Sequence, residues 1–483
     1  MPSSDGKMAS DSNAYGLRRE LTWIHSLSVI VGTMIGAGIF IVTAQAAEIM
    51  GPAVPIGFLA AVPVTVATAL IYAVYLSSPL GNQPGGAYVH ISRTWNSLFA
   101  GYVFMWLKCI AFIGAVATIG LGFGEAMHFF DAFTSVGSQW WAVAWIAVFF
   151  GLNLAGIDVF GRVQTAMTVG LLAVLTVIVV PGLAFVDPAN FSPLFPDEQY
   201  DYGVLPTFIQ GTAVIMFSYA GFEALAQTAG ETRNPQKTLP PVFLYSTLFV
   251  GLLYTLVTVV VIGVLGWQSA AASATPLTAT AQVYFPVGTA VVVVIGSMLA
   301  FATSLNASFM VPSRILFAFA ADRLIPSVFM HVNRRFGTPD IGLTITFVVS
   351  TFIVVTGTFE FALRIALAAI FLLYAAHAFS ALALPWIRPS LYEQCTLAFT
   401  PWILAVIAGC SAVSMAAFTW LTLEIDSVTP AIALIVAGDV VGGVTRSPAL
   451  LVLAWLLVGV LIYVGYSTYR KTTGGTNDSN SSL

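Results

Sequence analysis

The sequence predicts an all-α polytopic membrane protein with twelve transmembrane helices, because its composition is apolar and its uncharged stretches are long. Of the 483 residues, 58% are hydrophobic and 8% are charged, whereas a soluble globular domain has roughly 25% charged residues. Residues 21–47 contain no Asp, Glu, Lys or Arg, and about 20 apolar residues suffice for a helix to cross the hydrocarbon core. Similar stretches recur along the whole chain, so a soluble fold is excluded.

The predicted membrane helices are apolar segments separated by loops rich in Pro, Gly, Asn or charged residues. The segment 428–444 is apolar too, but Pro430, Asp439 and a pair of glycines favour a long loop or a re-entrant piece there. The twelve predicted spans are residues 22–48, 53–76, 98–127, 140–157, 164–186, 206–229, 242–266, 285–320, 340–359, 363–385, 399–422 and 448–468.

Positive charge gives the predicted orientation, because Lys and Arg collect in cytoplasmic loops. With the N-terminus inside, 14 of the 17 Lys and Arg residues fall on the inside. The predicted outside loops 128–139, 187–205 and 267–284 contain none. We therefore expect a multi-pass protein of the cell membrane, with cytoplasmic tails at residues 1–21 and 469–483.

Three glycines interrupt the first predicted span, in the stretch VGTMIGAGIF. Gly32 and Gly36 form a small-xxx-small pattern that lets two helices approach closely. Gly38 follows Gly36 by two residues and lies on another helix face, so packing of one face does not explain it. An unpaired backbone group in lipid costs several kcal/mol, so an unwound stretch must be buried in protein or line a cavity. We expect the helix to bend or break here.

The sixth predicted span carries a second interruption at Gly221, with the carboxylate of Glu223 close by. Span six begins five helices after span one, so two five-helix halves would have opposite orientations in the membrane. Interrupted helices in matching positions of such halves indicate the substrate site of a secondary transporter. Free N–H groups at one broken end suit a carboxylate and free C=O groups at another suit an ammonium, and an α-amino acid has both.

Five stretches in order along the chain carry motifs: Gly36-Ala37-Gly38-Ile39-Phe40, Gly85-Gly86-Ala87-Tyr88, Phe217-Ser218-Tyr219-Ala220-Gly221-Phe222-Glu223, residues 231–240, and residues 313–339. Together they resemble the amino acid–polyamine–organocation (APC) superfamily of transporters. The resemblance implies a LeuT-type fold with inverted five-helix repeats at residues 22–186 and 206–385 and two peripheral helices within 399–468. It also implies alternating access to a central amino acid site.

The resemblance implies roles for residues at the two breaks. The N–H groups of Gly36, Ala37 and Gly38 would hold the substrate carboxylate. The carbonyls of Met34 and Ala220 would accept hydrogen bonds from its ammonium. The expected substrate-binding residues, with Phe217 as an aromatic gate, are Met34, Ile35, Gly36, Ala37, Gly38, Cys109, Phe217, Ser218, Tyr219, Ala220 and Gly221.

Four polar side chains inside predicted spans are candidates for coupling or gating. Glu223 in span six either marks function or bonds to the freed backbone of the breaks. Lys108 in span three is either a surrogate for a proton or sodium site, or it pairs with a carboxylate or snorkels. Thr303 and Ser304 in span eight either bind a sodium ion or bond to nearby backbone. His90 lies at a helix start or in a loop, where we expect a structural role.

The predicted function is secondary active transport of amino acids by alternating access, with proton coupling, sodium coupling or exchange left open. Small and aromatic site residues favour a neutral or broad substrate. A polyamine or other organocation is the alternative within the same fold, although polyamines lack the carboxylate. A channel or a membrane enzyme has less support, because catalytic acids and histidines are not clustered. We expect no enzyme activity, cofactor, metal or nucleic-acid partner; the protein is a monomer or a homo-oligomer.

Overall fold

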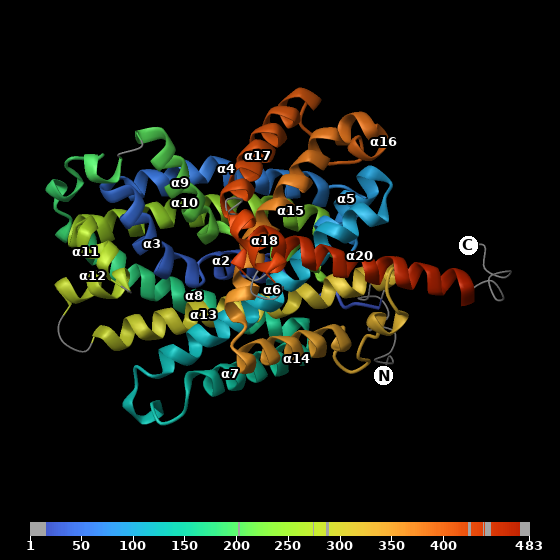
Figure 1. The fold of residues 1–483 in the computed structure, drawn as a ribbon, viewed down its shortest axis with the longest axis horizontal. Coiled ribbons are helices and arrows are strands. Elements are labelled where there is room, and N and C mark those ends of the chain that lie inside the picture. Colours follow the sequence, from blue (N-terminus) through green and yellow to red (C-terminus); the bar gives the residue numbers. More distant parts are fainter. Residues whose placement is uncertain are drawn as a thin grey trace, which may run out of the picture.

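The chain folds into a bundle of helices in a computed structural model that describes residues 16–200, 203–273, 275–285, 289–423, 427–437, 439 and 446–473 (Figure 1). The predicted all-α polytopic fold is confirmed. The α-helices are α2 Trp23–Met34, α3 Ala37–Met50, α4 Val54–Leu76, α5 Ala87–Trp95, α6 Leu98–Met127, α7 Ser138–Leu154, α8 Ile157–Gly182, α9 Val204–Met216, α10 Pro235–Leu265, α11 Trp267–Ala272, α12 Pro276–Tyr284, α13 Thr289–Ala321, α14 Asp340–Thr356, α15 Phe359–Ile387, α16 Pro389–Tyr392, α17 Pro401–Thr422, α18 Val428–Val436 and α20 Pro448–Thr473.

Helices long and apolar enough to cross a membrane account for ten candidate spans among the described residues. The predicted spans four and nine correspond to α7 and α14, which are shorter apolar helices of 17 residues each. A helix of 17 residues rises about 26 Å, close to the thickness of the hydrocarbon core. A multi-pass membrane protein is therefore established, and the count of twelve crossings stays a prediction.

Both predicted interruptions are present as breaks in the helices. Span one breaks at Ile35 and Gly36, between α2 and α3. Span six leaves α9 through the 3-10 turn η7 (Phe217–Tyr219), breaks at Ala220 and Gly221, and resumes as the 3-10 helix η8 (Phe222–Glu231). Gly221 has a φ of 108°, a conformation that suits glycine because it has no Cβ.

Helix α2, the first half of the broken span one, lies near the centre of the bundle (Figure 1). Helix α2 packs against α8, α10 and α13, and η8 packs against α2, α10 and α13. Helix α6 packs against α13 and α15 on another side of the centre. The two breaks are therefore enclosed by protein, as backbone groups inside a bilayer require.

The segment 428–444 differs in part from the predicted loop, because Val428–Val436 form the helix α18. Pro430 lies in its first turn, where a proline is compatible with a helix because no N–H is needed there. The helix has nine residues and rises about 14 Å, too little to cross the bilayer. Residues 440–445 lie outside the described residues, so a re-entrant path stays a prediction.

A buried ion pair and backbone bonds join segments on the predicted cytoplasmic side. Arg314 Nη2 donates to Glu231 Oε1 at 2.8 Å and Nε donates to Oε2 at 2.9 Å. The Leu21 N–H donates to the Glu231 carbonyl at 3.1 Å, and the Arg233 N–H donates to the Leu21 carbonyl at 2.9 Å. The chain just before α2 is thus tied to the end of η8, closing this side of the bundle.

Glu231→Gln is expected to lower the free energy of unfolding by about 3–5 kcal/mol, because Arg314 would keep a buried charge without a carboxylate. Denaturant unfolding of the purified protein in detergent measures this. Asp158→Asn is the control, because it removes a more exposed pair with Arg162 on one helix and should cost about 0–1 kcal/mol. Equal stability of the two variants would contradict the expectation.

Candidate functional site

A cavity of about 930 Å³ reaches both breaks. This volume is within the range of ligand pockets, about 300–1,000 Å³. Its deep part is lined by residues of the breaks and of α6, α13 and α15, including Thr33, Met34, Gly36, Gly38, Ala111, Phe112, Ala115, Phe217, Ser218, Ala220, Gly221, Ser304 and Ile370. Its other end is lined by Gln45, Glu125, Gln139, Gln210 and Thr422. These five residues lie near helix ends that the predicted topology places outside, so the cavity opens toward the predicted outer face.

Hydroxyl groups hold the backbone at the two breaks. The Tyr254 hydroxyl of α10 bonds to the carbonyl of Met34 in the first break and, at 3.2 Å, to the carbonyl of Ser218 in the second. The Ser304 hydroxyl of α13 donates to the Thr33 carbonyl at 3.3 Å. A carbonyl oxygen has two lone pairs, so these carbonyls keep accepting capacity for a ligand.

Close packing explains all three glycines of span one, including Gly38. A Cβ on Gly36 would lie 1.8 Å from Ser304 Oγ, and one on Gly38 would lie 2.8 Å from the Cα of Ser218. The prediction that packing does not reach Gly38 is wrong, because it applied the face geometry of one continuous helix across the break. Gly38 belongs to α3, a separate segment that packs against η7.

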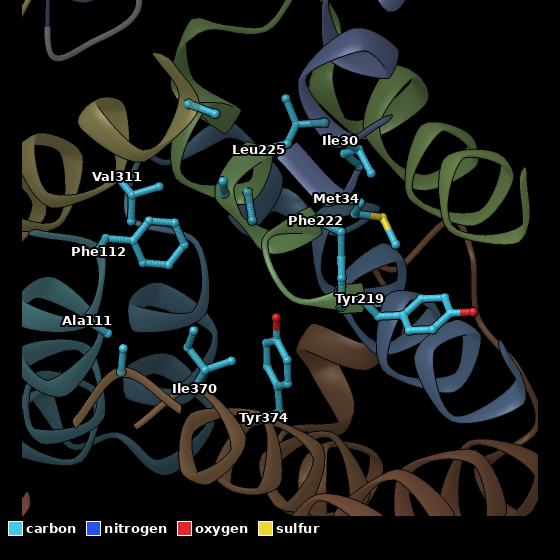
Figure 2. Packing of buried hydrophobic residues seen from close by; sticks show 14 of the residues in the cluster. Ile30, Met34, Ala111, Phe112, Tyr219, Phe222, Leu225, Val311, Ile370 and Tyr374 are labelled. Atoms are coloured by element: carbon cyan, nitrogen blue, oxygen red, sulfur yellow. The ribbon is translucent and has the colours of Figure 1, made fainter. Parts of the chain in front are cut away.

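Glu223 is held by groups from three elements. Its Oε2 accepts the N–H of Gly221 at 3.0 Å and the hydroxyl of Tyr374 from α15. Figure 2 shows Tyr374 pointing toward the bend between Tyr219 and Phe222. The Lys108 Nζ of α6 lies 3.6 Å from Glu223 Oε1, and both charged side chains are fully buried. We call Glu223, Lys108 and Tyr374 the carboxylate clamp.

The region predicted to offer sodium ligands contains a side-chain amide. Thr303 Oγ1 donates to a carbonyl of its own helix at 2.9 Å. Gln164 Nε2 of α8 donates to the Thr303 carbonyl at 3.2 Å and to the Ser28 carbonyl of α2 at 3.5 Å. Asn306 Nδ2 orients this amide by donating to Gln164 Oε1 at 2.8 Å. A neutral amide therefore joins α2 to α13 beside Thr303 and Ser304.

Comparison with known proteins decides the family, because the model of the amino acid permease family matches residues 21–444. The chain belongs to this family. The resemblance to the APC superfamily is thereby confirmed.

Relatives of this amino acid permease include transporters of two substrate classes. A chloroplastic cationic amino acid transporter of Arabidopsis thaliana is 29% identical over 69% of this chain, which spans 60% of that transporter's length. Branched-chain amino acid permeases of Bacillus subtilis and Lactococcus lactis are 26% and 28% identical over 69% of this chain and over 73% and 75% of their own lengths.

The cavity of the permease brings together most of the residues predicted to bind substrate. Ile35, Cys109 and Tyr219 are buried but are not among the described lining residues, and the Tyr219 hydroxyl donates to the Phe58 carbonyl at 2.9 Å. Ala37 begins α3 at the break. The predicted residues that line the cavity are Met34, Gly36, Gly38, Phe217, Ser218, Ala220 and Gly221.

Sequence reasoning missed three residues that hold the site of the permease, namely Tyr254, Tyr374 and Gln164. Each places a hydroxyl or an amide inside an apolar span, and polar groups in such spans tend to be functional. That signal is present in the sequence. It does not specify which carbonyl or carboxylate each group reaches, because the partners lie on other helices.

Gly38→Ala is expected to reduce transport by about 10- to 100-fold, because its Cβ would displace the backbone at Ser218 and misplace the site. Amino acid uptake by cells, corrected for the amount of protein in the membrane, measures the effect. Gly409→Ala in α17 is the matched control, because an added Cβ there meets no atom within 4 Å. Equal uptake by the two variants would show that the close contact at Gly38 is not required.

Proposed function

We propose that this permease is a secondary active transporter that binds an α-amino acid between the two breaks and moves it by alternating access. The observation that carries the proposal is the cavity that reaches both breaks from the predicted outer face. Helix α3 begins there without a side-chain cap, so its first N–H groups and dipole suit the substrate carboxylate. The carbonyls of Met34 and Ala220 suit the ammonium.

A neutral, apolar substrate side chain fits the deep part of the cavity. Ala111, Ala115 and Ile370 supply small or aliphatic surfaces, and Phe112 and Phe217 supply aromatic ones. Among the described lining residues the charged one is Glu125, at the outer end. Near the breaks the described carboxylate is Glu223, which is already paired with Lys108, so a cationic side chain would stay unpaired, and burying an unpaired charge is costly. The branched-chain relatives agree with this choice.

The carboxylate clamp supports coupling to protons. It connects η8, which follows the break in span six, to α6 and α15. A proton on Glu223 removes the negative charge that holds Lys108 and weakens the hydrogen bonds that the carboxylate accepts from Gly221 and Tyr374. The clamp then loosens, and η8 can move relative to α6. In contrast, the Gln164 amide presents its N–H donors to the Ser28 and Thr303 carbonyls, and N–H donors at that position argue against a sodium ion there.

Counterflow with purified protein in liposomes tests the proposed transport. Liposomes loaded with one unlabelled amino acid at a time are expected to accumulate the same labelled amino acid, most strongly for leucine, isoleucine or valine. Strongest counterflow with lysine or arginine would overturn the neutral preference. Absence of saturable, stereoselective counterflow for all twenty amino acids would overturn the transport proposal itself.

Glu223→Gln is expected to abolish accumulation driven by a pH gradient while counterflow persists, because glutamine accepts the same hydrogen bonds but takes no proton. The single variant leaves Lys108 buried without a counter-charge, which can impair folding. The double variant Glu223→Gln, Lys108→Met removes both charges, so a loss of coupling in it does not come from an unpaired Lys108. Glu125→Gln is the matched control, because this carboxylate lines the cavity outside the clamp. Accumulation that requires sodium and fails in choline would contradict proton coupling.

A further inference from the structure

Two histidines form a buried pair on the predicted cytoplasmic side of the carboxylate clamp. His90 of α5 and His377 of α15 place Nδ1 and Nε2 3.0 Å apart. Their exposures are 1% and 0%. Tyr75 stacks on both rings, with centroid distances of 4.6 and 5.2 Å, and the Tyr72 ring lies 4.2 Å from that of His377. The pair is thus enclosed by α4, α5 and α15.

Four buried polar atoms of the histidine pair, of the clamp and of Tyr72 have no hydrogen-bond partner among the described residues. They are His377 Nδ1, the Tyr72 hydroxyl, Lys108 Nζ and Glu223 Oε1. Native proteins leave few such atoms unsatisfied, and polar buried sites of this kind hold water. Four of them on four neighbouring elements form a hydrophilic strip inside an otherwise apolar core.

The strip is continuous with the clamp. Tyr374, which donates to Glu223, precedes His377 by three residues on α15, so the two side chains lie on one face of the helix. The Tyr72 ring lies 5.8 Å from that of Phe222, the residue next to Glu223. The path therefore leads from Glu223, past Tyr72 and Tyr374, to His377.

Beyond the pair, α5 leads to the predicted cytoplasmic surface. Arg93 follows His90 by one turn of α5 and forms two hydrogen bonds to Asp322, at 2.9 and 2.8 Å. Both residues are partly exposed. One turn of helix, about 5 Å, thus separates the buried pair from groups that reach solvent.

We propose that His90 and His377 form a proton relay between Glu223 and the cytoplasmic side, an inference that rests on the proton coupling proposed above. His377 takes a proton at Nδ1 and passes its Nε2 proton to Nδ1 of His90, which releases a proton from Nε2. Each ring gains one proton and loses one, and the donor in the shared bond changes from His377 to His90. No bond between heavy atoms forms or breaks.

The surroundings of the pair make its positive charge transient. Burial removes the water that would stabilise a positive charge on either ring, and the ammonium of Lys108 repels that charge. The other titratable groups near the pair are Tyr72 and Tyr75 of α4, Tyr374 of α15, Glu223 of η8 and the thiol of Cys395, which lies within electrostatic reach of Tyr75. Glu223 is the carboxyl group among them, and it is already paired with Lys108. A proton reaching the pair is therefore passed on rather than stored.

The relay is tested in liposomes that contain a pH-sensitive dye, with the amino acid that gives the strongest counterflow. For His377→Gln and for His90→Gln, proton entry during uptake is expected to fall about tenfold or more, because a side-chain proton carrier is lost. Counterflow should stay near the wild-type rate, since it needs no net proton movement. The double variant should match the single ones, because the two rings act as one unit.

Ser380→Ala is the matched control, because Trp95 Nε1 donates to Ser380 Oγ at 2.8 Å and so joins the same two helices without a titratable group. It should keep both proton entry and counterflow. Wild-type proton entry in the histidine variants would overturn the relay. Parallel loss of counterflow and proton entry in the histidine variants would also overturn it, by showing a structural role. Net amino acid uptake by the wild-type protein without proton entry would instead overturn the proposed coupling, and the relay with it.

Discussion

Lipid offers no hydrogen bonds, so each N–H and C=O group of an unwound peptide inside a bilayer must be buried in protein or line a cavity. The Tyr254 hydroxyl forms hydrogen bonds to a carbonyl in each break, and the Ser304 hydroxyl donates to a carbonyl at the end of α2. The Glu223 carboxylate accepts the N–H of Gly221. Two of these three side chains come from neighbouring helices, α10 and α13. The shape of the site is therefore determined by the helices around the breaks as much as by the broken segments.

The same low-polarity interior requires each buried charge to have a counter-charge. Two pairs satisfy this requirement with different geometry. Arg314 and Glu231 form two hydrogen bonds at 2.8 and 2.9 Å, whereas Lys108 and Glu223 stay 3.6 Å apart. The tight pair lies on the closed side of the bundle and the loose pair lies beside the break in span six. The loose pair loses less when it separates, which suits a part of the protein that moves.

Patterns within single segments were sufficient to predict the all-α membrane fold and both breaks, but not the helix α18 at Val428–Val436. Apolar runs and loop residues indicated the spans, the spacing of Gly36 and Gly38 indicated the first break, and Gly221 beside Glu223 indicated the second. Contacts between distant segments were not predictable in this way. Tyr254 reaches a carbonyl 220 residues away and Tyr374 reaches a carboxylate 151 residues away. The error at Gly38 has the same origin, because its neighbour Ser218 lies on another span.

The size of the open cavity adds water to the energetics of the transport cycle. Liquid water occupies about 30 Å³ per molecule, so a volume of about 930 Å³ corresponds to on the order of thirty waters. In the proposed cycle one amino acid would replace only a few of them, and closure over the substrate would return the others to bulk solution. Solutes too large to enter the cavity lower the activity of water outside it. Such solutes favour the closed form in proportion to the volume of water that closure expels.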